Sequence, residues 1–124
     1  VSVFPTEPKS NPLKDWLESC KYIKKRVPND VLVLPSHNEP FRGLHERLDH
    51  LINGHEKNLS RLLDFCEEPK KAIDVFSVLF KRKITSDLLL MATGESIAHL
   101  NCLVDRGLLC SKRDDKGVIN YFKI

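Results

Sequence analysis

The sequence predicts an α+β fold that is mostly helical, with a strand-helix-strand unit followed by helices and a C-terminal hairpin. Three observations support this prediction. Apolar residues recur at helical spacing over most of the chain. Two short apolar segments, 1–4 and 31–34, have the composition of strands. Two apolar runs flank the turn sequence Asp115-Lys116-Gly117 near the C-terminus, a pattern typical of a hairpin.

The first third of the chain has the order strand, helix, strand. Residues 1–4 alternate as in a strand and lack an initiator methionine, so we expect further sequence upstream. A helix is expected to start at Asn11, a suitable N-cap, with Pro12 at its first position, and to end at Pro28. The apolar run 31–34 then predicts a strand buried on both faces. The apolar face of the helix comprises Leu13, Trp16, Leu17, Cys20 and Ile23.

The segment from Pro35 to Gly43 is expected to be a loop. It contains two prolines and a glycine, so neither a helix nor a strand can run through it. Loops at the ends of buried strands often carry binding and catalytic groups. The sequence therefore directs attention to this loop.

The remaining residues predict three helices and the hairpin. The first helix has an apolar face over residues 44–66, and the second begins at Pro69. The third follows a cap at Thr85 or Ser86 and stops at Gly107. This order, helix, helix, hairpin, is that of a winged-helix module.

Composition excludes several classes of protein. A chain of 124 residues suits one compact domain, and the formal charge of +3 is too small to indicate a nucleic-acid partner. The four cysteines are widely spaced without a Cys-x-x-Cys pair, so they are interpreted as reduced thiols. No apolar run approaches the ~20 residues that span a bilayer. We therefore expect a soluble, cytoplasmic protein with no membrane partner.

Residues 30–40, together with 15–19, resemble the last part of the metallo-β-lactamase-fold hydrolases. In that family, a helix with a tryptophan and a serine in this arrangement leads to a strand that ends in a Pro-Gly-His-Gly-like turn. Here Ser36 and Asn38 stand where glycines are usual, and the histidine is His37. Serine and asparagine narrow the backbone freedom of the turn.

The resemblance continues through the helical half. One set of residues looks like the helix of glyoxalase-II-like hydrolases: Arg47, Leu51, His55, Leu59, Arg61 and Leu62. A second set looks like the helical appendage of one bacterial subgroup: residues 94–100, Leu103 and Gly107. The resemblance implies that residues 1–43 are the C-terminal end of the metallo-β-lactamase core and that residues 44–124 are a helical, winged-helix-like appendage.

The resemblance also implies a zinc-dependent hydrolase of an ester, thioester or lactam-like small-molecule substrate. Two zinc ions would lower the pKa of a bound water toward ~7 in the parent enzyme. Most ligands come from an upstream His-x-His-x-Asp-His motif that this sequence lacks, and only the last ligand matches, at His37. The chain should therefore bind no zinc and catalyse nothing alone, and its partner is the N-terminal metallo-β-lactamase core.

Two residues after this loop are candidates for substrate binding. Phe41 and Arg42 would lie at the mouth of the parent's active site. Arg42 would contact an acidic group of the substrate, or it would cap a neighbouring carbonyl instead. The sequence leaves both roles open.

The other histidines are expected to have structural roles. His45, His50 and His55 recur every five residues, about 140° apart on a helix, so they cannot converge on one ion. His55 lies in line with apolar residues and is interpreted as a partly buried, hydrogen-bonded packing residue. Glu95 and His99, four residues apart, are expected to form an exposed pair.

An alternative function is an interaction or nucleic-acid-binding module without catalysis. In that case the helix exposing Ala98, Asn101 and Asp105 would enter the major groove, with a wing at residues 112–116. That helix exposes few cations, which argues against phosphate binding. Packing against the hydrolase core, or a homo-oligomer that covers the apolar segments 1–4 and 31–34, is the preferred expectation.

Overall fold

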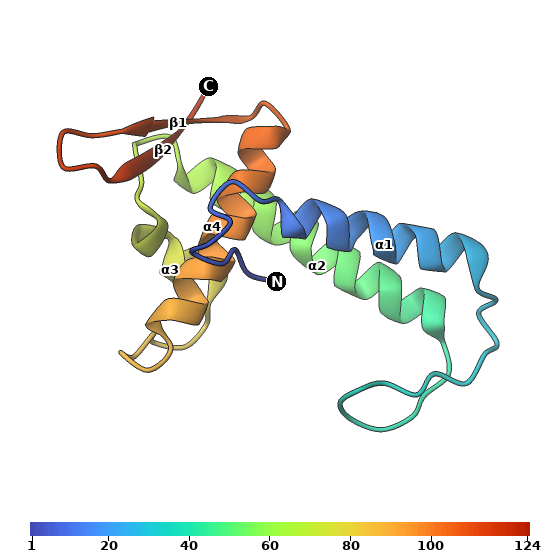
Figure 1. The fold of residues 1–124 in the computed structure, drawn as a ribbon. Coiled ribbons are helices and arrows are strands. Elements are labelled where there is room, and N and C mark those ends of the chain that lie inside the picture. Colours follow the sequence, from blue (N-terminus) through green and yellow to red (C-terminus); the bar gives the residue numbers. More distant parts are fainter.

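In the computed structural model, which describes residues 1–124, two long antiparallel helices form an arm that projects from a helical body (Figure 1). The arm consists of α1 (Pro12–Arg26) and α2 (Leu44–Phe65). The loop between them lies at the free end of the arm, far from the C-terminal strands (Figure 1).

The body follows α2 in the chain. It contains the 3-10 helix η1 (Ala72–Val75), the one-turn helix α3 (Phe76–Leu79), the long helix α4 (Leu89–Asp105), and the strands β1 (Leu109–Arg113) and β2 (Ile119–Lys123). The fold class predicted from the sequence, α+β and mostly helical, is confirmed.

Helix α1 begins and ends where its sequence dictates. The Asn11 side chain accepts a hydrogen bond from the Lys14 backbone N–H at 3.3 Å, and Pro12 occupies the first position. Three basic residues, 24–26, lie in the last turn, where they oppose the negative end of the helix dipole. The predicted start and end of this helix are thus confirmed.

The hydrophobic core lies where α1, α2 and α4 meet the hairpin. Its largest fully buried members come from all four: Leu13 in α1, Leu59 and Leu62 in α2, Leu100 in α4 and Leu109 in β1. The other buried members are Val3, Leu17, Cys66, Val75, Ala98, Cys102, Leu103 and Tyr121. Helix α1 therefore shares one core with the elements that follow it.

The two predicted N-terminal strands do not form, and this part of the prediction is wrong. Residues 1–4 have no strand partner; instead, the Val3 N–H donates to the Gly94 carbonyl of α4 at 2.9 Å. In the second segment, only Val33 pairs, through a single antiparallel bridge to Phe41. Leu34 is 74% exposed rather than buried on both faces. The reason is that a strand needs a neighbouring strand to complete its backbone hydrogen bonds, and no strand of the sheet lies beside either segment.

The N-terminal segment approaches α4 so closely that one position accepts only glycine. A Cβ atom built on Gly94 would lie 2.8 Å from the Val3 carbonyl oxygen. A side chain there must push the N-terminal segment away from the helix, and Val3, which is 5% exposed, would lose its place in the core.

We expect Gly94→Ala to lower the free energy of unfolding by about 1–3 kcal/mol, the usual cost of an overpacked contact. Gly54 is the matched control, because it also lies inside a helix and a Cβ atom added to it would meet nothing within 4 Å. Gly54→Ala should raise stability by about 0.5–1 kcal/mol through helix propensity. Chemical denaturation of both variants measures the difference, and equal effects would contradict the close approach.

The second predicted helix is shorter than expected. The backbone of Lys70 pairs with that of Tyr121 through two hydrogen bonds of 2.8 Å, so the chain stays extended after Pro69. Helical structure starts only at Ala72 and ends at Leu79. Tertiary pairing thus overrides the helical pattern at the start of this segment.

The end of the third helix and the hairpin agree with the sequence, but the predicted cap at Thr85 or Ser86 is wrong. Helix α4 begins only at Leu89, after Leu88, which provides no side-chain cap, and the Thr85 hydroxyl donates to the Asp87 carboxylate instead. Gly107 has φ of 73°, and the Gly107 and Leu108 N–H groups donate to the carbonyls of Val104 and Leu103 in a Schellman motif. Strands β1 and β2 pair in antiparallel register, with Ser111 opposite Tyr121. Both the helix stop and the hairpin are confirmed.

The candidate metal-ligand loop

The loop of residues 27–43 is fixed at its base by two side chains. The His45 Nε2–H donates to the Val27 carbonyl at 2.7 Å, which assigns the proton to Nε2 because a carbonyl can only accept. The Asn29 Oδ1 accepts from the His45 backbone N–H at 2.8 Å, and its Nδ2 donates to Glu46 at 3.2 Å. The end of α1 is thereby tied to the start of α2.

Asn29 also performs the capping that α2 lacks locally. The N-cap of α2 is Gly43, which has no side chain to accept from the first free N–H groups. Asn29 supplies the acceptor from 16 residues away in the chain. A side-chain cap on a helix N-terminus typically contributes about 1 kcal/mol.

Two further contacts close the loop above this base. Arg42 Nη1 donates to the Asp30 carbonyl at 2.6 Å. Val33 and Phe41 exchange backbone hydrogen bonds of 2.8 and 3.1 Å. Capping of a neighbouring carbonyl, one of the two roles expected for Arg42, is therefore present in the structure.

His37 lies at the tip of this loop with its side chain exposed. The following residue, Asn38, has φ of 70°, a left-handed conformation in the position that the sequence resemblance gives to glycine. Asparagine tolerates this conformation better than other non-glycine residues, so the turn keeps its shape. Below the tip, the bridge between Val33 and Phe41 holds its two sides together.

The chain by itself does not assemble a metal site around His37. No group of three or more histidine, cysteine, aspartate or glutamate side chains in the structure could hold a metal ion. Structural and catalytic zinc sites use three or four protein ligands. His37 can therefore supply one ligand, and the rest of such a site would have to come from outside these residues.

Removing the cap should loosen the loop without unfolding the chain. Asn29→Ala breaks both contacts of the side chain and leaves the His45 N–H without its acceptor, so we expect a loss of about 1 kcal/mol. Asn58 in α2 offers a control, because its side chain has no hydrogen bond in the structure. Amide hydrogen exchange should accelerate at residues 30–46 in Asn29→Ala only; unchanged exchange there would rule out the cap.

A second cluster of histidines lies in the interior, where α1, α2 and α4 meet. His55 Nδ1 lies 3.4 Å from His99 Nε2, and the rings of His55 and Trp16 contact edge to face with centroids 4.9 Å apart. The predicted packing role of His55 is confirmed. His99 is only 2% exposed, and its Nδ1 bonds the Glu95 backbone carbonyl at 2.8 Å.

The predicted exposed Glu95–His99 pair is therefore wrong. A spacing of four residues along a helix suits a side-chain pair, but His99 turns toward α2 and uses the backbone of Glu95 instead. Burial lowers the pKa of His99 below its ordinary value, and the hydrogen bond to Glu95 offsets part of this shift. The neighbouring apolar residues Leu100 and Leu103 were the available signal that this helix is buried on several sides.

The helix face expected to enter a DNA groove is not free. Ala98 is fully buried, and the Asn101 amide donates to the Pro8 and Ser10 carbonyls at 3.1 and 2.9 Å. Asp105 forms an ion pair with Lys14 at 3.4 Å. The interpretation of this face as a recognition surface is wrong, because the N-terminal segment and α1 occupy it.

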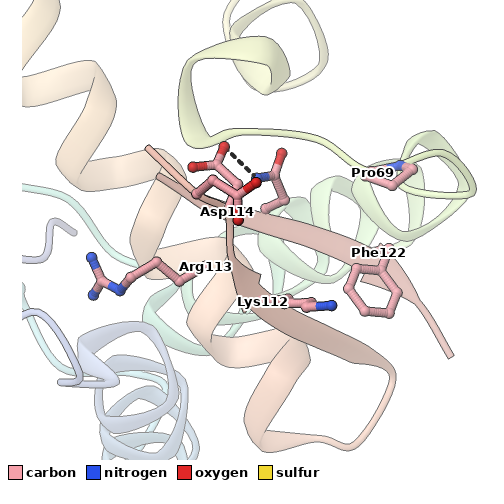
Figure 2. A pocket seen from close by; sticks show the side chains of 7 residues that line it. Pro69, Lys112, Arg113, Asp114 and Phe122 are labelled. Atoms are coloured by element: carbon pink, nitrogen blue, oxygen red, sulfur yellow. Dashed lines mark hydrogen bonds between the residues drawn. The ribbon is translucent and has the colours of Figure 1, made fainter. Parts of the chain in front are cut away.

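The hairpin of β1 and β2 has a shallow concavity of about 330 Å³ along one side (Figure 2). Figure 2 shows Lys112 extending toward Phe122 while Arg113 extends the other way. The Asp114 carboxylate accepts from the backbone N–H groups of Lys116 and Val118 and from the Asn120 amide. These hydrogen bonds within the turn lower the pKa of Asp114. Its carboxylate therefore stabilises the turn and is not free to bind a ligand.

Comparison with known proteins decides the family. A family model described as "Metallo-beta-lactamase-like, C-terminal domain" matches residues 59–124. The chain belongs to this family. The predicted membership of the metallo-β-lactamase family is thus confirmed, and no curated protein matches the sequence.

Two solved structures share the whole fold of this metallo-β-lactamase-like chain. A beta-lactamase domain protein from Burkholderia ambifaria is 38% identical, with a TM-score of 0.92 over 100% of this chain. A metallo-beta-lactamase family protein from Thermus thermophilus is 25% identical, with a TM-score of 0.81 over the same extent. The chain spans 37% of the length of each of these proteins.

None of the helices has the length and apolar character needed to cross a membrane.

Proposed function

We propose that the chain works as the C-terminal part of a zinc-dependent hydrolase, in which His37 is one ligand of a second metal ion. The observation that carries this proposal is the loop itself. An exposed histidine lies at the tip of a turn that the Val33–Phe41 bridge closes, and by sequence it corresponds to the residue that the resemblance gives as the family's last ligand. Membership of the metallo-β-lactamase-like family supports the hydrolase class.

The contribution of this chain to such a site is positional. Asn29 and His45 fix the base of the loop, and the Arg42–Asp30 contact fixes one side. A ligand held in one direction binds a metal with less loss of conformational entropy than a mobile one. His37 needs no partner within the chain for this role.

We propose that the substrate is an ester, thioester or lactam-like small molecule bound next to Phe41 and Arg42. Arg42 uses Nη1 for the Asp30 carbonyl, and the rest of its exposed guanidinium would meet an acidic substrate group. Phe41 belongs to the bridge that closes the loop. Both residues would then line the entrance to the site.

The partner of this chain would be an N-terminal metallo-β-lactamase core, with residues 1–43 completing that core and residues 44–124 forming a winged-helix-like appendage. Leu32 and Leu34, which are 53% and 74% exposed, are apolar side chains that such a core would cover. Without that core, a homo-oligomer that forms through Leu32 and Leu34 would cover these two side chains. Three buried free thiols, Cys20, Cys66 and Cys102, support a cytoplasmic location.

Metal analysis and turnover of the full-length protein test this function. We expect about two zinc ions per chain and hydrolysis of at least one ester, thioester or lactam substrate that a chelator abolishes and zinc restores. The 124-residue chain alone should hold well under one equivalent after dialysis. Full-length protein that hydrolyses these substrates equally well in a chelator would exclude the proposed role.

A further inference from the structure

The contact between His55 and His99 brings two imidazole side chains together where α1, α2 and α4 meet. His55 comes from α2 and His99 from α4, and Trp16 of α1 packs against the His55 ring. The two imidazole rings have centroids 5.4 Å apart and an interplanar angle of 36°. This contact is one of the side-chain links between α4 and the arm.

The hydrogen bonds determine where the protons lie. The Glu95 carbonyl accepts from His99 Nδ1, so this nitrogen carries a proton. In the neutral ring, Nε2 of His99 is then an acceptor, and the atom that faces it at 3.4 Å, His55 Nδ1, must be the donor. His55 Nε2 is left with its lone pair. Two neutral rings can therefore form this hydrogen bond in only one way, with His55 Nδ1–H as the donor and His99 Nε2 as the acceptor.

This arrangement accepts one proton but not two. The first proton goes to Nε2 of His55, the less buried ring, and the Nδ1–H of His55 still donates to His99. A second proton has only Nε2 of His99 to occupy. Two N–H groups and two positive charges would then face each other at 3.4 Å inside the protein, and the contact must break.

No neighbouring charge compensates this second proton. His99 makes no hydrogen bond to a carboxylate, since Glu95 contributes only its backbone carbonyl. The carboxylate next to His55 in the chain, Glu56, already binds Arg106 through two hydrogen bonds of 2.8 Å. Burial, His99 and the α-amino group of Val1 lower the pKa of His55, while the Glu95 and Glu56 charges raise it.

We propose that the His55–His99 contact is a pH-sensitive switch that holds α4 against α2 and α1 while both rings are neutral and releases it in mildly acidic solution. The released state keeps two ion pairs, Glu56–Arg106 between α2 and the end of α4 and Lys14–Asp105 between α1 and α4, so release separates the helices around Trp16 first. The switch is independent of the metal-ligand role of His37.

The direction of the pH dependence follows from both rings. Burial is the largest cause of the lowered pKa of His55 and of His99, so the folded chain binds these protons less readily than the unfolded chain. Stability from this contact is therefore complete above about pH 6.5, the ordinary histidine value. It declines as the pH falls below that value, because the unfolded chain takes up protons first.

Two measurements on the 124-residue chain test the switch, both in a chelator so that no transition metal bridges the two nitrogens. Long-range ¹H–¹⁵N spectra at about pH 7.5 should show His99 protonated at Nδ1 and His55 at Nδ1, the assigned tautomers. Fluorescence of Trp16, the only tryptophan, should change between about pH 6.5 and 4.5, and the melting temperature should fall over the same interval.

His99→Gln separates the switch from a general acid effect. Its amide oxygen can accept from His55 Nδ1–H at the position of Nε2 but cannot take up a proton. We expect this variant to lose at least half of the pH dependence of the melting temperature and of the Trp16 fluorescence.

His50→Gln, on the exposed side of α2, is the control and should behave as the unchanged chain. Equal pH dependence in both variants, or a different tautomer of either ring, would overturn the proposal. Should His99→Gln fail to fold, His55→Gln repeats the comparison.

Discussion

Replacing His37 with alanine in the full-length protein should remove about one metal ion per chain and lower turnover on the order of a hundredfold or more. The reason is that a metal ion that loses one of its protein ligands is no longer bound tightly. The folded structure should hardly change. His37 is exposed at a loop tip and makes no side-chain contact that holds the loop, whose anchors are Asn29, Arg42 and His45. Thermal stability in the metal-free state should therefore stay within about 0.5 kcal/mol of the parent.

His50→Ala is the matched control for this experiment, since His50 is also an exposed histidine but lies on α2 away from the loop tip. It should keep the full metal content and turnover. Asn29→Ala provides an intermediate case: the ligand is present but its loop is less well fixed, so metal affinity should fall by about 10–100-fold. Unchanged turnover in His37→Ala would mean that His37 is not a ligand.

Among the variants described, Leu62→Ala should lower the free energy of unfolding the most, by about 2–5 kcal/mol, since it removes a fully buried side chain from the core. Leu62 lies in α2 where this helix meets α1, α4 and the hairpin, so the cavity has rigid walls on several sides and little means of collapse. A domain of this size is typically stable by about 5–15 kcal/mol, so the variant should remain folded at low temperature but melt much earlier.

Leu90→Ala is the matched control for Leu62→Ala, because the same atoms are removed from a side chain that is 72% exposed. Its free energy of unfolding should change by less than about 0.5 kcal/mol. Chemical denaturation gives both values on one scale. A loss below about 1 kcal/mol in Leu62→Ala would show that the junction of α1, α2 and α4 is less tightly packed than the structure describes.

Local signals in the sequence predicted some ends of elements, although the expected helix starts at Pro69 and after Thr85 or Ser86 were wrong. The cap at Asn11 and the stop at Gly107 depend on bonds within a few residues, and both occur as expected. The residues around Asp115-Lys116-Gly117 likewise predicted the hairpin. Such signals act through neighbouring backbone groups, so no knowledge of the rest of the fold is needed to interpret them.

Long-range contacts explain what the sequence could not predict. The apolar run 31–34 has the composition of a buried strand, yet burial depends on neighbours that no local pattern specifies. The partner of His99 could not be predicted, because its contact with His55 spans 44 residues. The cap that Asn29 gives to α2 is of the same kind. For the candidate site, the sequence identified His37 and the loop, whereas the anchors of that loop appear only in the structure.

The pairing of β2 leaves the small sheet with one open edge. Tyr121 in β2 bonds to Lys70 on one side, and β2 pairs with β1 on the other, so β1 carries the unpaired backbone groups. An open edge invites strands from other molecules to add to the sheet. Lys112 and Arg113 are exposed on this edge, and two positive charges on an incoming copy would meet two on the first. These two charges therefore oppose the addition of a second copy's β1 to this edge of the hairpin.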